Sequence, residues 1–427
     1  MKGLRRTRIK GWYEFTKIAC PVCGKTGACM QHKDGNMVAC IRVESKKFFS
    51  KNSSLPSYLH FLNGDQRRQK IDDNQVIEVS EPKADEDTLH RIYTELINCL
   101  TLSNEHLKHL TSPDRGLNLN QVQEREYRSF PDKPWVVVKE IQKRLGIDNF
   151  KGVPGFYEAQ GKYGSNYWTI SGRSGILIPF RNSRQQIVGF QYRLDNPSND
   201  VKVDQRYPGL TAEVIEQPNV VRIYKDNELL YEKILELDKG VFIYDRKSEK
   251  DLKIKDILGS VTLKKGNRYY WLSSANKPKG TGSGDPPPIH VSLPTGIRRR
   301  GENGIQAKSV WLSEGPLKID IASDKIQDIL TASELEEYGN IFLGLPGVNA
   351  WQIVLPLLEA MRVEVVNLAF DADVVNNPYV RLNLMKCVKE LKIRGYHVNM
   401  VIWNAEDGKG IDDLFIGHKK PNINALF

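Results

Sequence analysis

The sequence of 427 residues lacks any apolar run near the roughly 18 residues that cross a membrane, which excludes a membrane-spanning protein. The first residues, MKGLRRTRIKGWYEF, are basic, but the apolar core of a secretory signal does not follow them. A Walker A loop is also missing, because Ala19 stands where the first glycine before Gly24-Lys25-Thr26 is required. We therefore expect a soluble, cytoplasmic protein without a helicase motor of that type.

Cysteine is scarce, and four of the six cysteines lie between positions 20 and 40. In a chain without a secretory signal, such a cluster indicates metal binding and not a disulfide framework. A Cys-x2-Cys turn followed by a glycine, here Gly24, is typical of tetrahedral zinc sites. His32 is a fifth possible ligand, as an alternative to Cys29. We predict Zn²⁺ bound by four thiolates, from Cys20, Cys23, Cys29 and Cys40.

Positive charge is concentrated at the N-terminus. Residues 1–70 hold 15 lysines and arginines against four acidic residues, a net charge of +11, whereas the other 357 residues hold 47 basic and 48 acidic ones. This distribution favours a polyanionic partner such as a nucleic acid, because neutralised phosphates release their counterions. A basic, solubilising tail is the alternative. The aromatic residues among these charges are expected either to stack on bases or to complete a small core: Trp12, Tyr13, Phe48 and Phe49.

The pattern along the chain changes several times. Residues 1–62 form the cysteine module, and the polar, partly acidic residues 63–87 indicate a flexible linker. Apolar residues at helical spacing follow from Thr88 to Leu110, and two β-rich runs, at 176–180 and 187–193, flank a polar turn that predicts a hairpin. From about residue 305 to 427 short apolar strands alternate with helices, which predicts a mostly parallel sheet covered by helices. The expected elements there are strands at 309–313, 341–345, 364–370 and 397–403, and helices at 316–326, 351–360 and 380–394.

Acidic residues follow the strands of this C-terminal region. Glu314 ends one predicted strand, and Asp371 and Asp373 follow another. Because the carboxyl ends of parallel strands meet at one edge of a sheet, we expect these carboxylates to converge. Oxygen ligands of this kind select Mg²⁺ or Mn²⁺. Asp412, in Gly-Lys-Gly-Ile-Asp-Asp, follows the last predicted strand and adds a further acidic group.

The order of these motifs resembles the TOPRIM domain, which bacterial-type primases share with topoisomerases and some nucleases. The likeness is strongest to primases of the bacterial, phage or plasmid type, because a zinc module comes first and SGILIPFRNSRQQIVGFQYRLD is similar to the segment before their TOPRIM domain. It extends over most of the chain except residues 200–265, which we interpret as an insertion. The resemblance implies an α/β protein, α+β overall, with a zinc-ribbon-like module, a mixed α/β primase subdomain at 88–304 and a TOPRIM domain at 305–427.

The resemblance also implies roles for individual residues. Glu314, Asp371 and Asp373 correspond to the catalytic and Mg²⁺- or Mn²⁺-binding acids, with Asp412 as an accessory ligand. Basic residues that face the template and nucleotide phosphates are expected at Arg181, Arg193 and Arg268. The sequence departs from the family pattern at two positions, where Lys318 and Gly410 stand in place of aspartates. Lys318 is expected to meet a nucleotide triphosphate or to extend towards solvent.

We therefore expect a DNA primase, a template-directed nucleotidyltransferase that makes short RNA or mixed primers from NTPs on single-stranded DNA. A TOPRIM nuclease and a non-enzymatic nucleic-acid-binding accessory with a degenerate TOPRIM domain are the alternatives. The compact arrangement without a motor favours a mobile element as the source. Since the chain ends soon after the last motif, a replicative helicase would be met through another surface.

Overall fold

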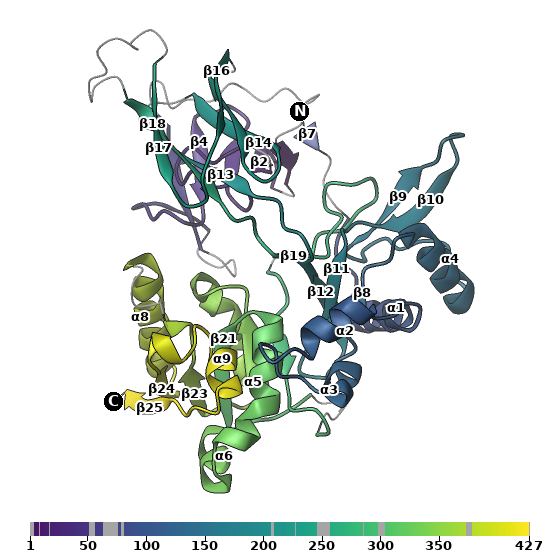
Figure 1. Cartoon of the computed structure of the whole chain (residues 1–427), viewed down its shortest axis with the longest axis vertical. Helices are drawn as coiled ribbons and strands as arrows, with labels where there is room; N and C mark the ends of the chain where they lie inside the picture. The colour runs from purple at the N-terminus through teal and green to yellow at the C-terminus, as the bar shows by residue number, and fades with distance from the viewer. Residues whose placement is uncertain are drawn as a thin grey trace. The chain divides into compact units, whose positions relative to one another are not determined.

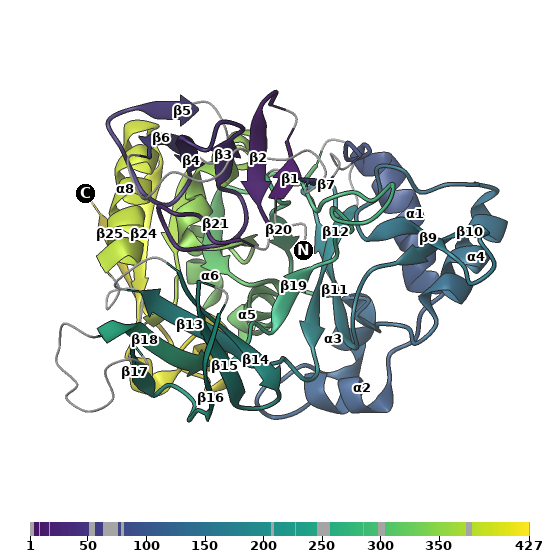
Figure 2. The same cartoon turned by 90° about the horizontal axis from the view of Figure 1, so that it is seen from above.

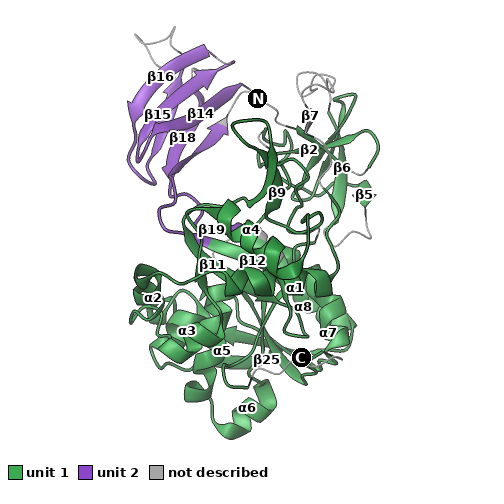
Figure 3. Ribbon diagram, turned by 90° about the vertical axis from the view of Figure 1, so that its right-hand side faces the viewer, with its two compact units in different colours: residues 1–192, 271–427 green, residues 193–270 purple. Residues whose placement is uncertain are grey.

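The structure is a computed structural model that describes residues 4–7, 9–16, 18–50, 56–62, 76–77, 81–205, 209–226, 228–245, 257–284, 286–297, 304–372 and 378–426. The chain forms two units (Figure 3). The first unit consists of Met1–Tyr192 and Trp271–Phe427, and the second consists of Arg193–Tyr270. The second unit contains residues 200–265, which the resemblance leaves uncovered. Among the described helices, none has the length and apolar character that crossing a membrane requires.

The N-terminal module is a seven-stranded sheet in the order β5-β6-β4-β3-β2-β1-β7. Its pairs are antiparallel except for β1 and β7, which run parallel. Its core is small, with Phe15, Val38 and Leu62 buried beside three cysteines. Apolar burial alone therefore stabilises this module weakly. The strands are β1 (Leu4–Arg6), β2 (Trp12–Phe15), β3 (Met30–His32), β4 (Met37–Cys40), β5 (Phe48–Ser50), β6 (Ser57–Phe61) and β7 (Val76–Ile77).

The aromatic residues of the module divide between the two expected roles. Trp12 and Tyr13 are each only 8% exposed, and the Trp12 ring lies 4.4 Å from that of Phe49. Phe48 is 45% exposed, with its ring 5.0 Å from that of Tyr58. Trp12 and Tyr13 thus belong to the core, whereas the Phe48 ring is partly exposed to solvent.

The predicted linker, residues 63–87, is ordered at its C-terminal end; residues 63–75 and 78–80 lie outside the described residues. The amide of Ala84 donates to the Gly152 carbonyl at 2.8 Å. Helix α1 begins at Glu86, because the Asp85 side chain caps it by accepting a hydrogen bond from the Thr88 amide.

The middle of the chain contains the predicted helices and hairpin. The apolar face of α1 packs with α4 around Phe150 and Phe156. The expected hairpin is β11 and β12, which are neighbours in the sheet β19-β12-β11-β8. The helices are α1 (Glu86–Asn98), α2 (Asn104–Leu110), α3 (Leu119–Glu124) and α4 (Pro134–Leu145). The strands are β8 (Arg128–Ser129), β9 (Phe156–Gln160), β10 (Asn166–Ile170), β11 (Gly175–Arg181), β12 (Ile187–Leu194) and β19 (Tyr269–Trp271).

The second unit is built from two three-stranded antiparallel sheets, β13-β18-β17 and β14-β15-β16. Their shared core includes Val221, Ile223, Ile243 and Val261, all fully buried. The strands are β13 (Asp200–Gln205), β14 (Leu210–Glu216), β15 (Val220–Lys225), β16 (Glu228–Ile234), β17 (Gly240–Tyr244) and β18 (Ile257–Lys264).

The C-terminal region contains the predicted, mostly parallel sheet, in the order β20-β22-β21-β23-β24-β25. The four inner strands are parallel, and β20 and β25 add antiparallel edges. The strands are β20 (His290–Ser292), β21 (Ser309–Glu314), β22 (Phe342–Leu345), β23 (Val365–Leu368), β24 (His397–Ile402) and β25 (Asn422–Leu426). The helices are α5 (Pro316–Ile329), α6 (Ala332–Tyr338), α7 (Leu355–Ala360), α8 (Pro378–Ile393) and α9 (Ile411–Ile416).

Helices cover both faces of this sheet (Figures 1 and 2). Strand β21 alternates between the faces: Val310 and Leu312 pack in one core with residues of α7 and α8, whereas Trp311 packs in another with residues of α5 and α9. Burial on both sides explains why these strands are short apolar runs. The mixed α/β fold with a doubly covered parallel sheet is confirmed.

The predicted helix at 351–360 is wrong in detail. A 3-10 helix, η5 (Val348–Val354), comes first, and α7 begins only at Leu355. Pro356 stands in the first turn of α7, where its missing amide is tolerated, but it cannot donate a hydrogen bond back to the preceding turn.

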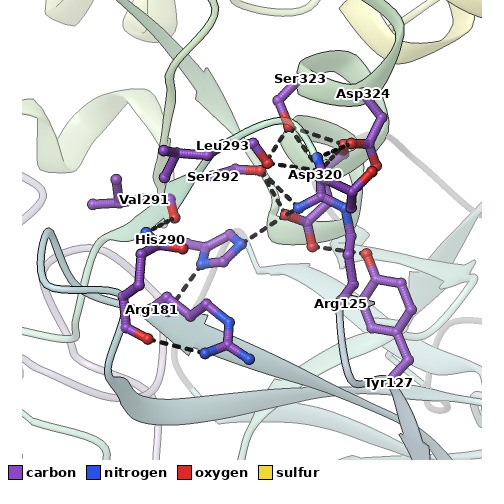
Figure 4. Close-up of polar contacts among 12 residues, drawn as sticks. Arg125, Tyr127, Arg181, His290, Val291, Ser292, Leu293, Asp320, Ser323 and Asp324 are labelled. Carbon is purple, nitrogen blue, oxygen red and sulfur yellow. Dashed lines mark hydrogen bonds and ion pairs between the residues drawn. The ribbon is translucent and has the colours of Figure 1, made fainter. Parts of the chain in front are cut away.

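A buried polar network joins α5 to the segment that follows α3 (Figure 4). Arg125 is 2% exposed, and its guanidinium binds Asp320 at 2.5 Å and Asp324 at 2.9 Å. Its other donors reach Ser292 Oγ, Ser323 Oγ and backbone carbonyls. Burial raises the pKa of Asp320, but the charge of Arg125 and the hydrogen bonds from His290 and Ser292 together outweigh this effect and leave that pKa below its ordinary value.

His290 and Tyr127 complete the network around Asp320. The Tyr127 hydroxyl donates to the Asp320 carboxylate at 2.7 Å. His290 Nδ1 accepts from the backbone amide of Arg181, so the proton is on Nε2, which lies 2.9 Å from Asp320 Oδ1. Burial lowers the pKa of His290, which favours this neutral form.

We predict that Arg125→Met lowers the free energy of unfolding by about 3–5 kcal/mol, because two buried carboxylates lose their countercharge. Urea unfolding followed by tryptophan fluorescence measures the change. Arg144→Met is the matched control, since Arg144 is 44% exposed and pairs with Glu140 on one helix face. It is expected to cost under about 1 kcal/mol, and an equal loss in both variants would contradict the role of the network.

The same network predicts a pH dependence. Because the pKa of Asp320 is lowered in the folded protein, its ionic contribution to stability is complete above the ordinary value of 3.8 and is lost as the pH falls below it. Urea unfolding from pH 6 to pH 3 should show a steeper decline for the wild-type protein than for Arg125→Met.

Candidate metal sites and nucleic-acid-binding residues

The four cysteines of the N-terminal module meet at one point. Their sulfur atoms all lie within 4.8 Å of one another. Cys23 Sγ and Cys40 Sγ are each 3.7 Å from Cys29 Sγ. Two Zn–S bonds of about 2.3 Å at a tetrahedral angle span about 3.8 Å, so the thiols fit a zinc ion. The cluster of four cysteines is as predicted, and it supports zinc binding.

Local backbone geometry builds this cluster. Cys20 and Cys23 lie on a tight turn that Gly24 closes at φ 68°, with its amide donating to the Cys20 carbonyl. Cys40 ends β4, where hydrogen bonds from the Cys20 and Cys29 thiols, with the backbone amides of Arg42 and Val43, lower its pKa. A thiolate is the form that binds a metal ion.

Arg42 adds a positive charge beside the cluster. Its Nη1 lies 3.4 Å from Cys29 Sγ and 3.7 Å from Cys23 Sγ, and it donates to the Gly27 carbonyl at 3.1 Å. Four thiolates around one Zn²⁺ carry an excess negative charge, which this guanidinium offsets. The sequence alone did not indicate this contact.

His32, the alternative ligand, lies outside the group of four. Its Nδ1 is 3.2 Å from an Asp34 carboxylate oxygen, and its ring meets that of Trp12 edge-on at 5.3 Å. The geometry therefore favours Cys29 over His32.

Three acidic residues gather near the carboxyl edge of the C-terminal sheet. Glu314 is the last residue of β21. Asp371 follows β23, which runs parallel to β21 and pairs with it, Leu368 lying opposite Leu312. Asp412 is the second residue of α9, and the preceding loop is held to the Asp371 loop by the Ala372 amide, which donates to the Lys409 carbonyl at 3.0 Å. Asp373 lies outside the described residues.

The surroundings of the three carboxylates differ. Glu314 Oε1 accepts a hydrogen bond of 2.7 Å from the Val348 amide, the first residue of η5. Asp371 forms an ion pair with the Lys318 ammonium from the first turn of α5. Asp412 is 3% exposed, and burial raises its pKa to about 6, against the opposing effect of Lys318.

Glu314 and Asp371 are hard oxygen donors that suit Mg²⁺ or Mn²⁺. Glu314 is held in place by a hydrogen bond from a backbone amide. Lys318 already balances part of the negative charge of this group. Among the described residues only the four cysteines lie close enough together to form a ready metal site, so a divalent cation at Glu314 and Asp371 stays a prediction.

The three predicted phosphate-binding arginines have unlike surroundings. Arg181 is 1% exposed, donates to the Gln185 carbonyl at 3.0 Å and forms an ion pair with Glu126. It lies on β11, which is buried along its whole length. Arg193 is 7% exposed and Arg268 is half-buried, both in the second unit. Phosphate binding by Arg181, Arg193 and Arg268 stays a prediction.

The Arg125–Asp320 network was not predicted. One signal for it exists in the sequence, since Asp320 stands between Ile319 and Ile321 on an apolar helix. A carboxylate at such a position requires a buried partner. The partner is 195 residues away in the chain, and local patterns do not identify it.

Comparisons with known proteins find distant similarities. The family model described as "Domain of unknown function (DUF3854)" matches residues 330–422, well under half of the chain. No curated protein matches.

Among solved structures, the chain is similar to the zinc-binding and RNA polymerase domains of the Aquifex aeolicus primase, with 10% identity and a TM-score of 0.40 over 98% of this chain and 81% of that one. It is also similar to the RNA polymerase domain of the Mycobacterium tuberculosis primase DnaG, with 12% identity and a TM-score of 0.39 over 77% and 79% of the two chains. A DnaG primase catalytic domain bound to single-stranded DNA gives 11% identity and a TM-score of 0.39 over 77% and 74%.

We predict that Cys29→Ser reduces bound zinc from on the order of one ion per chain to near zero, because a tetrahedral site loses one of its four thiolates. His32→Ala, the control in the same module, is expected to retain the ion. Zinc content of the purified proteins by mass spectrometry decides between the two ligand sets. Loss of zinc in His32→Ala with retention in Cys29→Ser would reverse the assignment.

Proposed function

We propose that the protein is a DNA primase, which joins ribonucleotides into short primers on a single-stranded DNA template. The observation that carries this proposal is the gathering of Glu314, Asp371 and Asp412 from three distant segments at one edge of a parallel sheet. Ligands of open α/β sheets bind at this edge. The TOPRIM-like order of the motifs and the cysteine cluster in a basic module support the same function.

Each residue has a separate task in this proposal. Glu314 and Asp371, with Asp373, hold Mg²⁺ or Mn²⁺, and Asp412 is an accessory acid beside them. When bound, the divalent cation activates the attacking 3′-hydroxyl and stabilises the negative charge on the leaving phosphate. The Val348 amide holds one oxygen of the Glu314 carboxylate in a fixed position.

The template is held by positive charge. We assign this task to the zinc module, whose residues 1–62 hold 12 basic and three acidic residues, and to Arg193 and Arg268 in the second unit. Exposed Phe48 provides a ring on which a base can stack.

One observation favours a second candidate function, a non-enzymatic nucleic-acid-binding protein. The Lys318 ammonium pairs with Asp371 and so weakens the attraction of that carboxylate for a metal ion. Incubation with single-stranded DNA, Mg²⁺ and labelled NTPs separates the candidates. Labelled primers support the primase, binding without products supports the accessory, and shortened DNA supports a nuclease.

We predict that Asp371→Asn lowers primer synthesis by about 10²-fold or more, since the neutral amide loses the charge that holds the divalent cation. The rate of labelled NTP incorporation measures this loss. Asp328→Asn is the matched control: Asp328 is exposed on α5, and its replacement should leave the rate within about twofold. An active Asp371→Asn protein would overturn the proposed catalytic site.

We predict that Arg268→Ala weakens binding of single-stranded DNA and reduces the salt dependence of log K by about one unit, the effect of one phosphate contact. Fluorescence anisotropy with a labelled oligonucleotide at several salt concentrations measures both quantities. Lys239→Ala, an exposed change in the same unit, is the control. If the two variants have equal slopes, Arg268 does not contact phosphate.

A further inference from the structure

Lys318 is placed unusually for a helix lysine. It lies in the first turn of α5, three residues after Gly315, and its side chain is 21% exposed. A lysine on a surface helix normally extends its ammonium into water. Here the ammonium forms an ion pair with Asp371, whose side chain is only 16% exposed.

Gly410 provides the space for this side chain. Its φ of −102° is accessible to any residue, so backbone geometry does not require glycine. A Cβ atom at this position would lie 2.9 Å from Lys318 Cε and 3.1 Å from Lys318 Cδ. It would also lie 2.3 Å from Asp412 Oδ1. Both positions at which the sequence departs from the TOPRIM pattern therefore belong to one structural feature, since the missing side chain at 410 makes room for the lysine.

Asp412 is buried with an incomplete set of polar partners. Its Oδ1 is buried and has no hydrogen-bond partner within the described residues. Arg115 Nη1 lies 3.9 Å from Asp412 Oδ2, at the limit of an ion pair. Lys318 is the other cation that acts on Asp412, by its charge. The lysine thus serves two carboxylates from two segments, Asp371 and Asp412.

We propose that the Lys318 ammonium is a resident cation of the carboxylate group, where it takes the place of one divalent ion. The group therefore binds a single Mg²⁺ or Mn²⁺, at Glu314 and Asp371, whereas sites with two metal ions bind a pair. This inference rests on the proposed function for the identity of the site. It concerns the number of ions, which is measured without any assay of priming.

A fixed ammonium differs from a second metal ion in its chemistry. It carries one positive charge instead of two, does not exchange with solution, and donates hydrogen bonds to phosphate oxygens. The expected contact of Lys318 with a nucleotide triphosphate agrees with this role, because the same ammonium can face a phosphate while it neutralises Asp371.

The test counts Mn²⁺ ions bound by the zinc-loaded, full-length protein, from the electron paramagnetic resonance signal of free Mn²⁺. Each protein is measured with and without the additional substitution Asp371→Asn. The ions assigned to the carboxylate group are those that this substitution removes. We expect one such ion in the wild-type chain and two in Lys318→Met, which keeps an unbranched side chain but removes the charge. Lys318→Gln provides a second, polar replacement, and thermal unfolding confirms that each variant is folded.

Two controls isolate the charge at position 318. Lys325→Met removes a charge two turns further along α5 and should leave one ion. Lys318→Arg retains a cation and should also leave one ion. A wild-type count other than one, or an unchanged count in both Lys318→Met and Lys318→Gln, overturns the inference.

The inference and the proposed function fail in different ways. A protein that makes primers while its count stays the same in the Lys318 variants retains the proposed function and loses the resident cation. A protein that makes no primers while its count rises from one to two retains the resident cation and loses the proposed function.

Discussion

The buried guanidinium of Arg125 is the interaction on which the position of α5 depends. It lies between Asp320 and Asp324 on the inner face of that helix, and it also bonds to the β20 edge through Ser292 and the Leu293 carbonyl. A buried charge with this many partners tolerates little displacement, since every broken bond leaves a desolvated polar group. Helix α5 starts two residues after Glu314 and carries Lys318 in its first turn. The geometry of the carboxylate group therefore depends on a network that lies outside it.

The carboxyl edge of the parallel sheet supplies the rest of that group. Parallel strands β21 and β23 are hydrogen-bonded neighbours, so the chain delivers Glu314 and Asp371 to the same edge although 57 positions separate them. The loop before α9 brings Gly410 and Asp412 to the same place. What distinguishes this edge from a simple acidic surface is the lysine that enters it through the space left by a glycine. Lys318 supplies the positive charge at this edge, and the missing side chain at Gly410 supplies the space that Lys318 occupies.

The N-terminal module is held together on a different principle. Its few buried apolar side chains make a small core, and four thiols occupy the centre of that core. A zinc ion bound by these thiolates would provide the stabilisation that apolar burial does not. The Arg42 contact shows that part of the positive charge of the module lies beside the cysteine cluster.

The sequence by itself determined the zinc cluster, the alternation of strands and helices, and the placing of acidic residues after strands. These features are local: cysteine spacing, periodic burial and strand ends are properties of short segments. Only the tertiary structure decided how the charged side chains pair. Arg181 is enclosed beside Glu126, Asp320 finds Arg125, and Lys318 meets Asp371 across 53 positions. Such pairs join residues distant in the chain, and the choice between solvent, phosphate and carboxylate depends on burial, which sequence spacing does not specify.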